Sequence, residues 1–264
     1  MTKRAVSPKL KRRHIEMGLF WGGVLLSAAG AVLFALPAPP APVVLGAGLA
    51  ALGLSLLLAG DVVAGPAPRS YSARGQVVRG RVDIAAGLSN VMLRGGLTDR
   101  AAAVTFGPFG RPQVTVEEGV AHVRLASPRL LPSLATWRAE LAGNVLWDLD
   151  VRSSLGGLLL DLRSLRLERV SARTWMGRLR VICPETLGHT EIELKTTLGT
   201  IEVIIPEGVG AQVTVSHGSL GTVRQKNERL LAPGQRRYVT ADFESAAAQV
   251  DIRIEAASGD VVLA

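Results

Sequence analysis

The side chains best suited to acid–base or metal chemistry are scattered along this chain of 264 residues. Asp148 and Asp150 alternate along a strand-like run and with Asp161 could bind a cation, but no nucleophile or base-orienting residue stands near them in sequence. His189 and Glu191 stand two positions apart, and no second pair completes a metal-ligand spacing. We therefore predict solvated strand faces here, no enzyme activity, no cofactor and no metal site.

A cluster of arginines is a stronger candidate for a binding site than these carboxylates and His189. Six arginines fall within eighteen positions, with only Asp161 and Glu168 to balance their charge locally. If the strands that carry them stack, these arginines form a basic ledge facing anionic lipid or an acidic protein segment. The alternative is that they are ordinary solvated arginines that discourage pairing at strand edges. The candidate contact residues are Arg163, Arg166, Arg169, Arg173, Arg178 and Arg180.

The formal net charge of +8 would suit a nucleic-acid partner, but its location argues against one. Residues 1–16 hold six lysines and arginines against Glu16 alone, directly before an apolar run. This pattern is typical of a cytoplasmic flank that contacts anionic membrane lipids. We expect lipid rather than nucleic acid beside the N-terminus.

Two uncharged apolar runs follow, residues 17–36 and residues 43–60, with the proline-rich residues 37–42 between them. At about 1.5 Å per residue the first run spans roughly 30 Å of hydrocarbon. We predict a transmembrane α-helical hairpin in the cell membrane, with the N-terminus and the following domain both cytoplasmic by the positive-inside rule. In the alternative, residues 1–36 are a cleavable signal, which would place that domain outside.

Small residues in the two runs would let the helix backbones approach closely, which matters where lipid gives no hydrophobic drive for association. Gly18 and Gly22 match a small-residue dimerisation motif, although packing within the hairpin is the interpretation we favour. The predicted helix-packing residues are Gly18, Gly22, Gly23, Gly46, Gly48 and Gly53.

The remainder of the chain has the texture of an all-β domain. Residues 61–76 have linker composition, and residues 77–264 carry short alternating runs separated by glycine and proline. Residues 128–140 lack a pattern and predict a loop or a short helical turn. The repetition predicts a stacked-strand β-solenoid or β-prism, with a β-sandwich as the alternative. In the solenoid, inward Val, Ile and Leu side chains are expected to form aliphatic columns along the axis. Several strands are expected to begin just after a glycine, at Gly157, Gly177, Gly199, Gly210, Gly221 and Gly259.

One stretch carries a family resemblance. Residues 198–211, LGTIEVIIPEGVGA, resemble the signature of the LiaF-like C-terminal domain of the cell-wall-active antibiotics response family, and residues 147–184 are similar to the related toastrack domain. The resemblance covers roughly residues 140–264. The resemblance implies a fold in which short strands stack like slices. It also implies a bacterial membrane regulator of envelope-stress signalling that restrains a sensor kinase. Such a regulator typically has more than the two membrane spans predicted for this chain.

Together these observations predict a membrane-anchored, non-enzymatic scaffold or regulator whose cytoplasmic β domain docks a protein partner. A sensor kinase is the partner that the resemblance implies. The alternative is a structural β-solenoid that self-assembles at the membrane surface through exposed end strands, although charged residues 253–260 could cap one end of such a homo-oligomer.

Overall fold

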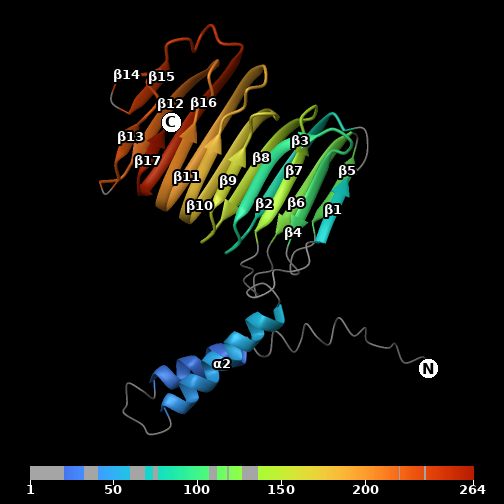
Figure 1. Cartoon of the computed structure of the whole chain (residues 1–264), viewed down its shortest axis with the longest axis vertical. Helices are drawn as coiled ribbons and strands as arrows, with labels where there is room; N and C mark the ends of the chain where they lie inside the picture. Colours follow the sequence, from blue (N-terminus) through green and yellow to red (C-terminus); the bar gives the residue numbers. More distant parts are fainter. Residues whose placement is uncertain are drawn as a thin grey trace, which may run out of the picture. The chain divides into compact units, whose positions relative to one another are not determined.

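The computed structural model describes residues 21–32, 41–59, 69–73, 77–106, 112–117, 119–126, 136–219, 221–234 and 236–264 (Figure 1). The chain divides into two compact units, Met1–Ala67 and Pro68–Ala264. We call them the N-terminal unit and the β unit. The predicted basic N-terminus, residues 1–16, lies outside the described residues.

The N-terminal unit contains two described helical stretches, residues 21–32 and α2 (Ala41–Ala59). Within this described part, no helix combines the length and the apolar character needed to cross a bilayer. The predicted hairpin of two membrane-spanning helices, residues 17–36 and 43–60, is therefore not confirmed. The first described stretch is also shorter than its prediction, because residues 17–20 and 33–36 lie outside the described residues.

In the described residues of the β unit, seventeen strands form one continuous mixed sheet that folds into two layers (Figure 1). Layer A contains, in spatial order, β5 (Gln113–Glu117), β6 (Val120–Ala126), β2 (Arg79–Ala85), β8 (Leu146–Ser153), the first half of β10 (Arg166–Ile182), the first half of β11 (Gly188–Ile204), β16 (Ala248–Ser258), β12 (Val209–His217), β15 (Arg237–Thr240) and β14 (Leu230–Gly234).

Layer B contains the strands that pair beside the second halves of the two long strands. In spatial order these are β1 (Arg69–Ala73), β4 (Ala102–Phe106), β7 (Trp137–Ala142), β3 (Val91–Leu97), β9 (Leu158–Asp161), β10, β11, β17 (Val261–Leu263) and β13 (Val223–Gln225). Because β10 and β11 run through both layers, each forms one complete slice of the stack.

We call each such slice a rung, with one strand segment in each layer. The rungs pair in parallel and follow the order β6/β7, β2/β3, β8/β9, β10, β11, β16/β17, β12/β13. The spatial order departs from the chain order at both ends. The first rung of the chain, β2/β3, lies inside β6/β7, and the last rung, β16/β17, lies inside β12/β13.

Aliphatic columns hold the rungs together, as the sequence predicts. Alternate side chains of each strand point inward, and partners in register on neighbouring rungs are buried together. At roughly 1.5–3 kcal/mol for each fully buried aliphatic side chain, these columns are the main source of stability. One column in layer A runs through Val82, Leu149, Val170, Ile192, Ile252 and Val213.

Glycines turn the strands from layer A to layer B. Gly177 and Gly199 pair in register, with φ of 146° and 136°, and a Cβ built on Gly199 would lie 2.0 Å from the Gly177 carbonyl oxygen. Only glycine tolerates both this dihedral region and this approach. The sequence predicts separate strands on either side of these glycines, whereas the structure continues each strand through its glycine.

Four strands, β14, β15, β1 and β7, occupy segments where the sequence predicts none. β1 lies in the predicted linker, residues 61–76, and pairs antiparallel with β4. β7 begins in the unpatterned residues 128–140, and its Trp137, Ala139 and Leu141 alternate inward and are buried. β1 and β7 depend on pairing with distant strands, which local sequence does not reveal.

Antiparallel strands cover three ends of the two layers. β5 covers β6, the β4–β1 pair covers β7, and the β15–β14 hairpin covers β12. Such covering blunts the edges that a self-assembling solenoid would use. The architecture therefore combines the parallel rungs of a solenoid with two facing layers.

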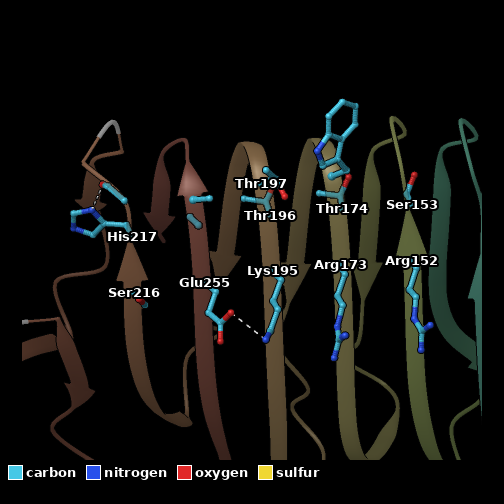
Figure 2. Close-up of a pocket in the computed structure, with 14 residues that line it drawn as sticks. Arg152, Ser153, Arg173, Thr174, Lys195, Thr196, Thr197, Ser216, His217 and Glu255 are labelled. Carbon is cyan, nitrogen blue, oxygen red and sulfur yellow. Dashed lines mark hydrogen bonds and ion pairs between the residues drawn. The ribbon is translucent and has the colours of Figure 1, made fainter.

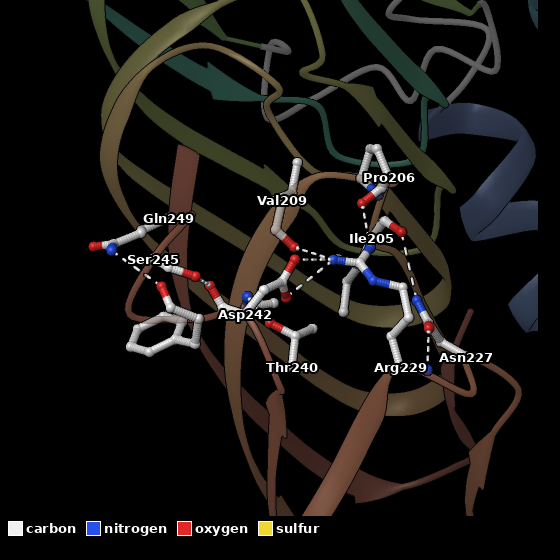
Figure 3. A network of polar contacts seen from close by, with 11 residues as sticks. Ile205, Pro206, Val209, Asn227, Arg229, Thr240, Asp242, Ser245 and Gln249 are labelled. Atoms are coloured by element: carbon white, nitrogen blue, oxygen red, sulfur yellow. Dashed lines mark hydrogen bonds and ion pairs between the residues drawn. The ribbon is translucent and has the colours of Figure 1, made fainter. Parts of the chain in front are cut away.

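The corner at residues 206–210, within the stretch that resembles the LiaF-like signature, is held by Arg229 (Figure 3). The guanidinium group donates hydrogen bonds to the carbonyl oxygens of Pro206 at 2.9 Å and Val209 at 3.0 Å, and to Asp242 Oδ2 at 2.9 Å. These contacts give the backbone oxygens of the corner a charged side-chain donor. The corner is therefore architectural.

Candidate interaction surface at the glycine corner

A trough of about 640 Å³ crosses five strands of layer A beside the glycine corners (Figure 2). Its lining residues come from β8, β10, β11, β16 and β12, all of which are held in register by the columns beneath. We call this feature the corner trough. Because it is built on rigid, paired strands rather than on loops, its side chains hold fixed relative positions.

One side of the trough is a row of charged side chains on successive rungs. Arg152 lies opposite Arg173, Arg173 opposite Lys195, and Lys195 opposite Glu255. Figure 2 shows the four side chains side by side, each from its own strand. Neighbouring strands lie about 4.8 Å apart, and like charges directly opposite one another destabilise a sheet. This charged row therefore carries a cost in stability.

Acidic groups beside the row offset part of that cost. Lys195 Nζ lies 2.9 Å from Glu193 and 3.0 Å from Glu255, and Arg173 lies 3.5 Å from the same Glu193. The hydrogen bond from Lys195 lowers the pKa of Glu193, and hydrogen bonds to Glu193 and Glu255 raise the pKa of Lys195. Lys195 and Glu193 thus hold each other in their charged forms.

The row remains available to a partner. Side-chain exposure is 56% for Arg152, 47% for Arg173 and 34% for Lys195. Exposed ion pairs contribute about 0–1 kcal/mol, so exchanging one carboxylate partner for another costs little. The three cations can therefore bind an incoming carboxylate or phosphate without unfolding the strands.

Exposed apolar side chains adjoin the trough at Trp175. Trp175 lines the trough, and Met176 beside it pairs in register with Leu198 of the next rung. With Leu155 of the preceding rung they form a ridge in which each side chain is 38–53% exposed. By contrast, Trp137 and Trp147 of the same unit are buried. We call these four residues the apolar ridge; exposed apolar clusters of this kind mark interaction sites.

Hydroxyl groups under the trough are committed to the backbone. Thr174 Oγ1 donates to the Met176 carbonyl oxygen at 3.3 Å, and Thr196 Oγ1 donates to the Leu198 carbonyl oxygen at 3.3 Å. Both threonine side chains are buried. These two hydroxyls shape the corner, whereas Thr197 and Ser216, which also line the trough, are exposed beside the charged row.

The predicted arginine ledge is divided by the fold. Arg166, Arg169 and Arg173 lie on the layer A half of β10, whereas Arg178 and Arg180 lie on its layer B half, and Arg163 lies in the turn after β9. Arg163, Arg169 and Arg180 pair with Asp161, Glu191 and Glu202 at 2.7, 3.1 and 3.6 Å. Of the six predicted contact residues, only Arg173 lines the trough.

The other charged members of the row, Arg152 and Lys195, were missed by sequence reasoning, as was Trp175. The signal was a spacing: residues 152, 173 and 195 are separated by 21 and 22 positions, close to the length of one rung. Glu255 breaks the spacing because its rung is inserted out of chain order.

The carboxylates first considered for chemistry are also separated by the layers. Asp148 and Asp150 lie on β8 in layer A, and Asp150 forms an ion pair with Arg152. Asp161 lies in layer B, on β9. His189 Nε2 lies 3.3 Å from Asp251, and Glu191 belongs to the pair with Arg169. Among the described residues, no group of three His, Cys, Asp or Glu side chains could hold a metal ion.

Glycines bring the two helical stretches of the N-terminal unit together. A Cβ on Gly23 would lie 2.7 Å from the Leu52 nitrogen, and a Cβ on Gly48 would lie 2.4 Å from the Ser27 nitrogen. Gly30, which sequence reasoning did not include, makes an equally close approach to Leu45. Gly22 and Gly46 face open space. Gly18 and the surroundings of Gly53 lie outside the described part of the chain.

No family model matches the chain, and no curated protein matches it. One solved structure, a candidate cell adhesion protein from Clostridium sporogenes ATCC 15579, superposes with a TM-score of 0.67 at 12% identity, over 75% of this chain and 98% of that one. A candidate adhesin from Bacteroides fragilis NCTC 9343 covers 75% of this chain and 96% of its own, with a TM-score of 0.28 at 7% identity. The first likeness shows the all-β fold alone, so the LiaF-like resemblance stays a prediction.

Proposed function

We propose that this protein is a non-enzymatic scaffold or regulator that docks a protein partner in the corner trough. The observation that carries the proposal is the apolar ridge, whose exposed side chains come from three neighbouring rungs and stand beside a row of three cations. Tryptophan and arginine are the residues most enriched among energetic hot spots of protein interfaces. The trough offers both within one rigid surface.

The rung architecture suits a docking role. Parallel strands in register fix the distance between the ridge and the charged row, so little conformational freedom is lost when a partner binds. The ridge can supply the apolar centre of an interface, and the charged row can supply its polar rim.

We further propose that the N-terminal unit holds the protein in a membrane, with the β unit on the cytoplasmic side. The sequence supports this through the uncharged residues 17–36 and 43–60 and the basic residues before them. Large apolar side chains are also exposed along both described helical stretches, at Trp21, Leu25, Leu26, Val32, Val43 and Leu49. Extraction of membranes with alkaline carbonate tests this: the full chain should stay in the pellet, and release into the supernatant would contradict it.

The resemblance to LiaF-like domains extends the proposal to a partner class. A regulator of that type acts on a sensor kinase of envelope-stress signalling, and the same role is proposed for this chain. The stretch that carries the resemblance, residues 198–211, begins at Leu198 of the apolar ridge.

The test of docking is recovery of crosslinked protein from membranes with variants of the full chain. The double substitution Trp175→Ala, Met176→Ala should reduce recovery of any specific partner, because it removes the centre of the ridge. Leu231→Ala is a matched control, because Leu231 is 57% exposed on the covering hairpin and Trp175 is 53% exposed. Equal recovery with both variants would contradict docking at this site.

A further inference from the structure

We infer that the segment docked in the corner trough is an amphipathic helix of the partner protein, with acidic residues along one face and apolar residues along the adjoining face. This inference rests on the proposed function and specifies its partner. It follows from the order of charges in the row, from their spacing, and from the ridge that runs beside them.

The order of charges is directional. Along successive rungs the row presents Arg152, Arg173, Lys195 and then Glu255, which is three cations followed by one anion. A complementary segment carries three acids followed by a base. A segment docked in the reverse direction would place its base beside Arg152 and an acid beside Glu255, which costs affinity.

The spacing of the row favours a helix over an extended strand. Rungs repeat at about 4.8 Å. In a helix, residues three and four apart have Cβ atoms about 5–6 Å apart, whereas alternate residues of a strand are about 6.8 Å apart. A helix lying across the strands can therefore place one acid beside each cation. The adjoining helix face then meets Trp175, Met176 and Leu198.

An anionic membrane surface is the rival occupant, and the same row argues against it. Glu255, at the end of the row, is 58% exposed. A uniformly anionic surface is repelled at Glu255, whereas a peptide can place its own base there. Three cations followed by an anion therefore select a patterned partner.

The experiment uses the full chain in its native membranes and identifies the crosslinked segment by mass spectrometry. An aromatic photoreactive amino acid replaces Trp175, so that a large aromatic side chain stays at the centre of the ridge. The expected segment has acidic residues three or four positions apart and apolar residues beside them. Crosslinking to lipid, or to a segment without this pattern, would overturn the inference.

A second experiment reverses the charge of one cation in the row and has a closely matched control. Arg173→Glu reverses the centre of the row and should lower the crosslink yield about tenfold or more. Arg180→Glu reverses an arginine of the same strand in layer B, with a similar exposure, 44% against 47%, and a similar ion pair, 3.6 Å against 3.5 Å. Its yield should be unchanged, and a comparable fall would contradict the assignment. Cys183 is a buried free cysteine, so a folded variant should not react with a thiol reagent. The absence of that reaction therefore verifies that each variant is folded.

A compensating charge reversal in the partner segment completes the test. Replacing one acid of the identified segment by lysine should restore the yield with the Arg173→Glu variant. Failure of that rescue, with protein still crosslinked at position 175, overturns the charge assignment but leaves docking standing. Absence of any protein crosslink at position 175 overturns the proposed function itself. The two failures are therefore distinguishable.

Discussion

Gly259 stacks directly on Gly199 at the corner of the β unit. A Cβ on Gly259 would lie 1.6 Å from the Gly199 carbonyl oxygen, and the two residues have φ of 142° and 136°. Together with Gly177 they form a column of glycines that turns three rungs from layer A into layer B. The column also sets the position of the apolar ridge, since Met176 and Leu198 immediately precede two of its members.

Gly199→Ala should destabilise the β unit by about 2 kcal/mol or more, because the new methyl group meets backbone atoms and the left-handed dihedral is strained. Gly208→Ala is the control, because Gly208 also has a positive φ, 79°, but has open space around it. Urea unfolding of the full chain measures both. Equal losses in the two variants would show that the close approach is unimportant.

Cys183 should report this unfolding directly. It is the only cysteine, and complete burial raises the pKa of its thiol to about 12. Because the thiolate is the reactive form, the native protein should not react with a thiol reagent near pH 8, and labelling should appear together with unfolding. Rapid stoichiometric labelling without denaturant would contradict the burial.

Arg229→Ala should lower the free energy of unfolding by about 1–3 kcal/mol, because the carbonyl oxygens of Pro206 and Val209 and the carboxylate of Asp242 each lose a charged donor. Arg224→Ala is the matched control. Arg224 is 66% exposed and pairs with Asp260 at 3.4 Å, so its loss should cost under about 1 kcal/mol. A larger loss for Arg224 than for Arg229 would refute the role given to the Arg229 network.

Acid should weaken the β unit through its carboxylates. The hydrogen bond from Arg163 lowers the pKa of Asp161, and the hydrogen bond from Lys195 lowers that of Glu193. A lowered folded pKa gives stability that is complete above the unfolded values, about 3.9 and 4.3, and is lost as pH falls through the folded values.

The unfolding free energy should therefore be flat from about pH 7 to about pH 5 and fall below about pH 4. Asp161→Asn and Glu193→Gln should each make that fall shallower. Titration of urea unfolding against pH measures the slope, and stability that rises on acidification would contradict the assigned pKa directions.

The features that depend on local sequence pattern, such as strand positions and corner glycines, could be predicted from the sequence. Alternating runs predict strands at residues 102–106 and 113–117, which are the observed bounds of β4 and β5, and the glycines before expected strands include the three of the corner column. The aliphatic columns followed from the same alternation. Stacking was predicted as well, because neither short run around residues 206–210 could bury its apolar face alone.

The order of the rungs could not be predicted in the same way. β2 lies between β6 and β8, and β16 lies between β11 and β12, so partners are separated by stretches of chain that carry no register signal. The trough is assembled by this order. Arg152, Lys195 and Glu255 become neighbours of Arg173 only after the rungs stack, which is why the predicted ledge followed chain proximity and included arginines of both layers.

Site-specific photocrosslinking of the full chain in its own membranes tests the central claim most directly. A photoreactive residue at position 175 should yield a crosslinked protein of defined mass, whereas the same residue at position 231, of similar exposure on the covering hairpin, should not. No protein crosslink at position 175, or the same products at both positions, would contradict docking at the corner trough.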